Sequence, residues 1–210
     1  MIHVMIADDH AIVRQGLKQI LNETEDIRVT GEAETGFQAI KIVRHHDFDV
    51  MLLDISLPDR NGIEVLKQIK KDKPNLAVLV LSMHNEHEFA IRALKAGAAG
   101  YLNKQSAPAQ LVIAIRQVAS GDKYVSPAVA QELANSINSD SDQPLYTILS
   151  DREFQTLCLI ASGKTLSDIS AELFLSPKTV SVYRARILEK LKLNNNSELI
   201  RYAIKNKLVD

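Results

Sequence analysis

The chain contains no tryptophan, only one cysteine and no long apolar run. A single cysteine excludes an internal disulfide, and Cys158 lies between two leucines, so we expect a buried thiol in a reducing compartment. The longest aliphatic run, 76–81, is far too short to cross a bilayer, and Asp8-Asp9 interrupts any signal-like stretch. These absences predict a cytoplasmic protein that makes no contact with a membrane.

The composition is that of an ordinary globular protein, with 46% hydrophobic and 24% charged residues in a chain of 210. That length suits one large domain or two small ones. Residues 145–210 hold 10 Lys and Arg against 7 Asp and Glu, a net charge of +3, so residues 1–144 carry −4. This asymmetry favours two domains with different partners.

Short apolar segments alternate with amphipathic ones through the first 120 residues. The apolar segments have the length and composition of buried strands, and the others have the apolar spacing of helices. The predicted strands are 2–7, 27–31, 50–54, 77–82 and 100–103, and the predicted helices are 13–21, 37–43, 63–71, 86–96 and 107–119. This alternation predicts an α/β domain with a five-stranded, doubly wound parallel sheet.

The rest of the chain reads as helical. Ser126-Pro127 is typical of a helix start and predicts a helix to about 137, followed by a polar tether at 138–144. A capping box at 150–153 and a second Ser-Pro start at 176–177 open two helices of an all-α domain. The predicted helices there are 151–162, 166–173, 177–192 and 197–205. We therefore predict a first domain at 1–120, a linker at 121–147 and a helical domain at 148–210.

Polar side chains lie at or just past the ends of four predicted strands. They are Asp8, Asp9, Asp54, Ser82 and Lys104. Since parallel strands bring their carboxyl ends to one edge of the sheet, these side chains are expected to converge. Three carboxylates raise one another's pKa values unless a cation joins them, and Mg²⁺ suits carboxylate and carbonyl oxygens. With a lysine and a hydroxyl nearby, the pattern predicts a site at which a carboxylate is phosphorylated.

These residues carry a family resemblance over 1–120. Asp8-Asp9, Asp54 with Pro58 and Gly62 behind it, Ser82, Tyr101 and Lys104 resemble a response-regulator receiver domain, which has a flavodoxin-like fold. The resemblance implies that Asp54 is the phosphoacceptor, that Asp9, Asp54 and the Ser56 carbonyl bind Mg²⁺, and that Asp8 assists. It also implies that Lys104 pairs with the phosphoryl group and that Ser82 and Tyr101 form the switch. Gln105 replaces a common proline, which leaves the geometry of the Lys104–Gln105 bond open.

A phosphohydrolase of the haloacid-dehalogenase type is the rival interpretation, because those enzymes also phosphorylate an aspartate that follows a strand. They place a second aspartate two residues later as the general acid–base, and that position here is Ser56. The sequence therefore favours a phosphorylated switch over an enzyme with turnover; such a protein assists only its own phosphorylation and dephosphorylation.

The helical domain has the spacing of a helix-turn-helix, with a short turn at 174–176. Its second helix carries five basic residues that make a plausible phosphate-contacting surface: Lys178, Arg184, Arg186, Lys190 and Lys192. The segments 149–153, 175–180 and 187–191 resemble a LuxR-type DNA-binding domain. The resemblance implies groove contacts from Lys178, Ser181, Val182 and Ala185, and phosphate contacts from Thr179 and Arg186. Because Ala185 stands where the family can have a base-reading lysine, we expect specificity to depend more on shape and on Val182.

The last predicted helix carries an apolar stripe of Leu199, Ile200, Ala203 and Ile204. The resemblance implies that it pairs two copies on DNA, although part of it suits the domain's own core. A receiver followed by this domain resembles NarL/FixJ-type transcription regulators. We therefore expect a homodimer on duplex DNA, controlled by a sensor histidine kinase. A receiver whose helical domain binds protein instead of DNA remains the alternative, and salt-dependent binding to duplex DNA would separate the two.

Overall fold

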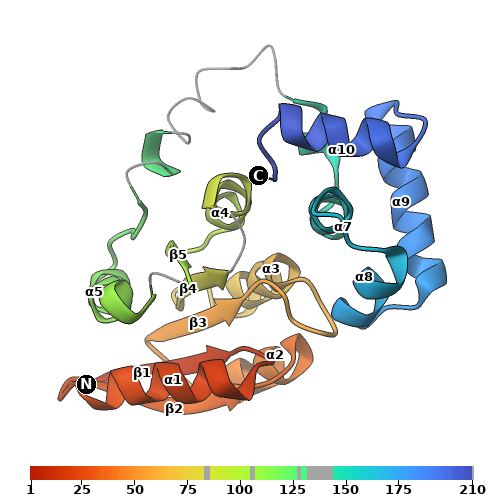
Figure 1. The fold of residues 1–210 in the computed structure, drawn as a ribbon. Coiled ribbons are helices and arrows are strands. Elements are labelled where there is room, and N and C mark those ends of the chain that lie inside the picture. Colours follow the sequence, from red (N-terminus) through yellow and green to blue (C-terminus); the bar gives the residue numbers. More distant parts are fainter. Residues whose placement is uncertain (83–85, 105–106, 127–128, 132–143, 210) are drawn as a thin grey trace. The chain divides into compact units, whose positions relative to one another are not determined.

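The computed structural model describes residues 1–82, 86–104, 107–126, 129–131 and 144–209. The chain divides into two compact units, 1–135 and 136–210, and each is considered by itself. Figure 1 shows the parallel strands of the first unit and the helices of the second.

The first unit is built on a five-stranded sheet whose described strands are all parallel. The strands are β1 Ile2–Ala7, β2 Ile27–Ala33, β3 Val50–Asp54, β4 Ala77–Ser82 and β5 Gly100–Asn103. Their order is β2-β1-β3-β4-β5, the flavodoxin-like arrangement, which confirms the predicted fold class. The central strand β3 is buried along its whole length, as its continuous apolar run predicts.

Helices cover both faces of this sheet (Figure 1). Helices α1 Ala11–Asn22 and α5 Ala107–Ala119 share one core with the strands. Helices α2 Gly36–His45, α3 Gly62–Asp72 and α4 Glu86–Lys95 pack in sequence, α2 on α3 and α3 on α4. The core of the first face contains Val4, Ile6, Leu17, Leu21, Leu52, Leu79, Leu81, Leu111 and Ile115. Alternation along each strand sends Met5, Met51, Leu53 and Val80, all buried, to the opposite face.

Helix α3 begins directly against the end of β3. Asn61 caps it, because its side chain accepts a hydrogen bond from the Ile63 backbone N–H at 2.8 Å. Gly62 is its first residue, and a Cβ there would lie 2.2 Å from the carbonyl oxygen of Asp54. Only glycine allows this close approach, which fixes the loop 55–61 between two rigid elements.

The second unit contains a 3-10 helix, η1 Leu145–Ile148, and helices α7 Asp151–Ala161, α8 Leu166–Glu172, α9 Pro177–Leu191 and α10 Asn196–Lys205. The predicted capping box is present, since Ser150 and Glu153 exchange side-chain hydrogen bonds with each other's backbone N–H. Gly163 follows α7 at φ +85°, in the left-handed region that ends helices. Thr165 and Asp168 form a second capping box on α8.

Part of the predicted linker lies outside the described residues. Residues 129–131 of the helix predicted from Ser126 are helical, and 132–137 with the tether at 138–143 are not described. The proposed boundaries at 120 and 148 therefore stay a prediction. Within the part of the chain that is described, no helix combines the length and the apolar character that crossing a membrane requires.

Candidate phosphorylation site and DNA-binding surface

Asp54 lies at the carboxyl end of β3, beside Leu81 of β4, with only 2% of its surface exposed. The Ser56 backbone N–H donates to its Oδ1 at 3.2 Å. Burial raises the pKa of the Asp54 carboxyl above its ordinary value; Lys104 opposes this shift and the charge of Asp8 adds to it. Asp54 therefore holds a buried carboxylate at the point where β3 ends and the loop to α3 begins.

Asp8 and Asp9 follow the neighbouring strand β1. Asp8 is buried, and its backbone N–H donates to the carbonyl oxygen of Ala33 at 3.1 Å. The buried Arg14 of α1 donates to the Asp8 carbonyl oxygen at 2.7 Å and to Glu34 at 2.5 Å. These contacts hold the backbone of the loop after β1 in place.

Lys104, just past β5, joins the two buried aspartates. Its Nζ lies 2.7 Å from Asp8 Oδ2 and 2.7 Å from Asp54 Oδ2. Burial alone lowers the pKa of the Lys104 ammonium, but the two carboxylates outweigh that effect and raise it. Three strands therefore bring one lysine and two buried carboxylates together, as the sequence predicts.

Three carboxylates and one lysine leave this edge with excess negative charge. Ligand atoms of Asp8, Asp9, His10 and Asp54 all lie within 4.8 Å of one another. Asp8 Oδ2 and Asp54 Oδ2 are buried, and each lies 2.7 Å from Lys104 Nζ, so a single ammonium group serves both carboxylates. Oxygen donors of this kind fit a hard divalent cation such as Mg²⁺. The geometry thus provides an acidic cluster able to hold a cation.

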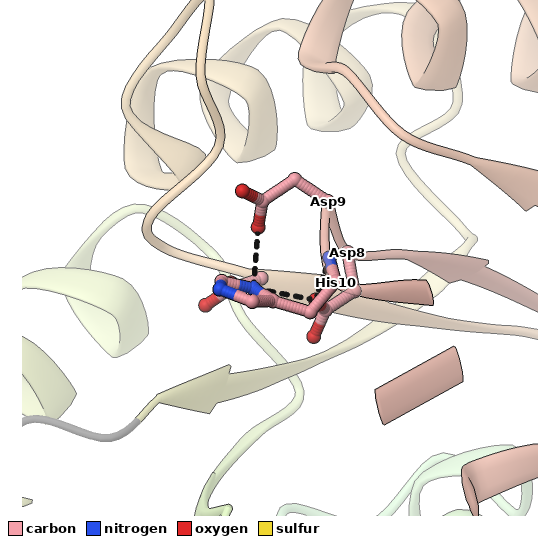
Figure 2. Close-up of side chains that lie close together, drawn as sticks. Asp8, Asp9 and His10 are labelled. Atoms are coloured by element: carbon pink, nitrogen blue, oxygen red, sulfur yellow. Dashed lines mark hydrogen bonds and ion pairs between the residues drawn. The ribbon is translucent and has the colours of Figure 1, made fainter. Parts of the chain in front are cut away.

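Figure 2 shows a residue that the sequence analysis missed, His10. Its Nδ1 lies 2.8 Å from Asp9 Oδ1 and 3.4 Å from Asp8 Oδ1. The only sequence signal for it is its position directly after the two aspartates.

Ser82 and Tyr101, the predicted switch residues, are both buried on adjacent strands. Ser82 ends β4 and lies opposite Asn103 in the register, while Tyr101 lies opposite Val80. The Lys104 backbone N–H donates to the Ser82 carbonyl oxygen at 2.9 Å, which joins the ends of β4 and β5. The Lys104–Gln105 bond lies outside the described residues, because Gln105 is not described.

A loop residue that sequence reasoning also missed, Asp59, connects the site to α2. Its carboxylate accepts hydrogen bonds from the backbone N–H groups of Gly36 at 2.7 Å and Phe37 at 2.8 Å. Thr35 caps the same helix through the N–H of Gln38. Asp59 therefore holds the loop after Asp54 against the first turn of α2.

The second unit presents the outer face of α9, on which the predicted DNA contacts lie. Val180, Ile187 and Leu191 are buried and anchor the helix. The predicted contacts Lys178, Ser181, Val182, Ala185 and Arg186 are exposed, while Thr179 is half-buried, its hydroxyl 2.8 Å from that of Ser176.

Two of the five basic residues of α9 are engaged inside the unit. Lys190 pairs with Glu153 of the capping box at 2.7 Å, and Arg184 donates to Asn196 at 2.5 Å. Burial alone raises the pKa of Glu153, but Lys190 and Ser150 outweigh it and lower the pKa. The basic surface predicted for phosphate contacts is therefore narrower than the sequence suggests, and Lys178, Arg186 and Lys192 remain exposed on it.

The apolar stripe of α10 is divided by its burial. Leu199 and Ala203 are fully buried, whereas Ile200 is half-buried and Ile204 is 53% exposed. A residue with no exposed surface cannot contact a second copy, so the predicted pairing surface is reduced to Ile200 and Ile204. On the same helix, the Tyr202 hydroxyl accepts a hydrogen bond from the Tyr146 backbone N–H at 3.0 Å, which ties η1 to α10.

Comparison with known proteins agrees with both halves of this description. Residues 4–116 match the response regulator receiver domain, and residues 147–203 match the luxR family of bacterial regulatory proteins. The chain is 39% identical to the response regulator UvrY of Escherichia coli K12, over 99% of this chain and 96% of that protein. It is 38% identical to the response regulator GacA of Pseudomonas aeruginosa, over 100% and 99% of the two chains.

Among solved structures, the RcsB response regulator of Salmonella typhimurium is similar with a TM-score of 0.58 at 30% identity, over 97% of this chain and 98% of that chain. A structure of RcsB in complex with DNA matches with a TM-score of 0.60, also at 30% identity and with the same coverage.

Proposed function

The chain belongs to the NarL/FixJ family of two-component response regulators, a receiver domain joined to a LuxR-type DNA-binding domain, and we propose that phosphorylation of Asp54 by a sensor histidine kinase controls its binding to DNA. The observation that carries this proposal is the Lys104 ammonium, which lies 2.7 Å from a carboxylate oxygen of both Asp8 and Asp54 at the carboxyl edge of the sheet.

In the proposed reaction, a carboxylate oxygen of Asp54 attacks the phosphorus of the kinase's phosphohistidine. An O–P bond forms, the P–N bond breaks, and its electron pair leaves on the imidazole nitrogen. Lys104 then exchanges its contact with Asp54 for one with a phosphoryl oxygen, where its positive charge offsets the charge that arrives. The Ser82 hydroxyl donates a hydrogen bond to another phosphoryl oxygen. Because the Ser82 carbonyl oxygen accepts a hydrogen bond from the Lys104 backbone N–H, the new contacts of Ser82 and Lys104 are both coupled to the end of β5. Tyr101 lies three residues before Lys104 on β5 and is proposed to respond to that shift.

Mg²⁺ is the proposed cofactor of this site. Asp8, Asp9, Asp54 and the carbonyl oxygen of Ser56 would hold it, and when bound it withdraws negative charge from the phosphoryl oxygens. The close cluster of Asp8, Asp9 and Asp54, whose negative charge the one lysine offsets only in part, supports this assignment.

The protein is proposed to be a switch and not an enzyme with turnover. A phosphohydrolase of the haloacid-dehalogenase type needs a general acid–base two residues after the phosphoacceptor, and Ser56 supplies no carboxylate there. We place the protein in the cytoplasm, where histidine kinases and DNA are accessible.

Phosphorylation of Asp54 is tested with a small acyl-phosphate donor and Mg²⁺. Intact-mass measurement should show the addition of one phosphoryl group to the wild type and none to Asp54→Asn, with unchanged circular dichroism. Lys104→Ala should still accept the phosphoryl group, but phosphorylation should no longer change its DNA binding. Equal labelling of Asp54→Asn would move the phosphoacceptor to another residue.

The DNA-binding surface is proposed to be the exposed face of α9. Lys178, Ser181, Val182 and Ala185 would enter the groove, and Thr179 and Arg186 would contact phosphates. Arg186→Ala should weaken binding to all sequences and reduce the slope of log affinity against log salt concentration by about one, the contribution of one phosphate contact. Val182→Ala should instead change the sequence preference. Lys41→Ala, which removes the same charge from the exposed face of α2, is the matched control and should bind like wild type. Binding that does not depend on salt would favour a protein-binding output domain instead.

Pairing of two copies on DNA is proposed to use the exposed edge of α10, Ile200 and Ile204. Two-fold symmetry matches paired half-sites, and each copy raises the effective concentration of the other at its half-site. Because a domain with a net charge of only +3 binds weakly alone, pairing would supply much of the affinity.

A further inference from the structure

His10 occupies the position before the first turn of α1, yet it gives that helix no side-chain hydrogen bond. Serine, threonine, aspartate or asparagine would cap the helix there, so the helix start does not account for a histidine. Its backbone is held beside the acidic cluster, because its N–H donates to Asp8 Oδ1 at 2.9 Å. The imidazole Nδ1 faces the carboxylates of Asp8 and Asp9 (Figure 2).

The separations of His10 Nδ1 from the Asp9 and Asp8 carboxylates are close to those between neighbouring ligands of a six-coordinate cation. With metal–ligand bonds of about 2.1 Å, neighbouring ligands lie ~3.0 Å apart and opposite ligands ~4.2 Å apart. His10 Nδ1 lies 2.8 Å from Asp9 Oδ1 and 3.4 Å from Asp8 Oδ1, and the set that includes Asp54 spans at most 4.8 Å. The side chain of His10 is 64% exposed, so its ring turns without displacing core residues.

We propose that His10 is a direct ligand of the divalent cation at this site, and that its nitrogen shifts the preference of the site from Mg²⁺ towards later first-row divalent ions such as Co²⁺ and Ni²⁺. Mg²⁺ prefers oxygen ligands, while imidazole strengthens binding along the series from Mn²⁺ to Cu²⁺. This inference rests on the proposed cation site, to which it adds a fourth side chain and a selectivity.

Direct coordination is tested with Mn²⁺ bound to the untagged full chain. Electron spin echo spectroscopy should show modulation from a coordinated imidazole nitrogen in the wild type, and the modulation should disappear in His10→Asn. His3→Asn removes a histidine from the amino end of β1 and is the matched control, in which the signal should remain. Bound Mn²⁺ without nitrogen modulation would overturn the role of His10 and leave the cation site intact. Failure of Mn²⁺ to bind, with Asp9→Asn behaving like wild type, would overturn both.

Selectivity is measured by calorimetric titration of the same proteins with Mg²⁺, Co²⁺ and Ni²⁺. His10→Asn should lower the affinity for Co²⁺ and Ni²⁺ by about tenfold or more and leave the affinity for Mg²⁺ within about twofold of wild type. An equal loss for all three ions would show that His10 acts only by orienting Asp9, which contradicts the proposal.

Discussion

Removing the Asp59 carboxylate should loosen the phosphorylation site without touching any residue that holds the phosphoryl group. The loop 55–61 is closed by the Gly62 N–H on the Ile55 carbonyl oxygen at 2.8 Å, and Asp59 ties its outer corner to the first turn of α2. Two hydrogen bonds from a carboxylate to helix N–H groups stabilise the fold by about 1–2 kcal/mol. Asp59→Ala should therefore lower the melting temperature of the receiver by roughly 3–8 °C.

Thr35→Ala is the matched control, because it removes the other cap of α2, a hydrogen bond that stays within this helix, at a similar cost of about 1 kcal/mol. Only Asp59→Ala should slow phosphorylation by an acyl-phosphate donor, by about tenfold, since a loop displaced by about 1 Å misplaces the Ser56 carbonyl and Asp54. Rates are compared at a temperature where both variants are folded. Equal phosphorylation rates in the two variants would refute the idea that Asp59 positions the loop.

Further predictions concern stability and pairing. Gly16 lies on the exposed face of α1, with open space where the Cβ of an alanine would lie. Gly16→Ala should therefore stabilise the receiver by about 0.5–1 kcal/mol in a thermal melt, and a lower melting temperature would contradict this. The pKa of Glu153 is lowered in the folded state, so its contribution to stability is present above the ordinary value of 4.5 and is lost as pH falls through the folded pKa. The free energy of unfolding, measured with urea, should accordingly fall less in Glu153→Gln than in wild type as pH falls below about 4.5. Ile204→Glu should weaken binding to a two-half-site duplex far more than to a single half-site, whereas equal losses would place the pairing contact elsewhere.

The sheet and the convergence of Asp8, Asp54 and Lys104 could be predicted because both follow from local patterns. Apolar runs define buried strands, and the parallel arrangement alone brings the residues after each strand to one edge. The contacts of Asp59 could not be predicted, since its partners lie 22 and 23 residues earlier and hydrogen-bond through their backbone, which leaves no mark in the sequence.

Charge and periodicity were less informative in the helical domain. A basic residue on α9 looks the same in the sequence whether it faces solvent or, like Lys190, pairs with Glu153. The period of α10 identifies an apolar stripe but does not say how much of it the protein itself covers, so the burial of Leu199 and Ala203 emerged only from the structure. The 3-10 helix η1 is too short for any periodic pattern.

The measurement that tests the central proposal most directly is the affinity of the full chain for duplex DNA before and after phosphorylation. The duplex is one selected in vitro from a random pool by the chain treated with acyl phosphate and Mg²⁺. Phosphorylation should tighten binding of the wild type by about tenfold or more, a coupling of about 1.4 kcal/mol between the two domains, and should leave Asp54→Asn unchanged. Equal affinities of phosphorylated and unphosphorylated wild type, or the same gain in Asp54→Asn, would contradict control of DNA binding through Asp54.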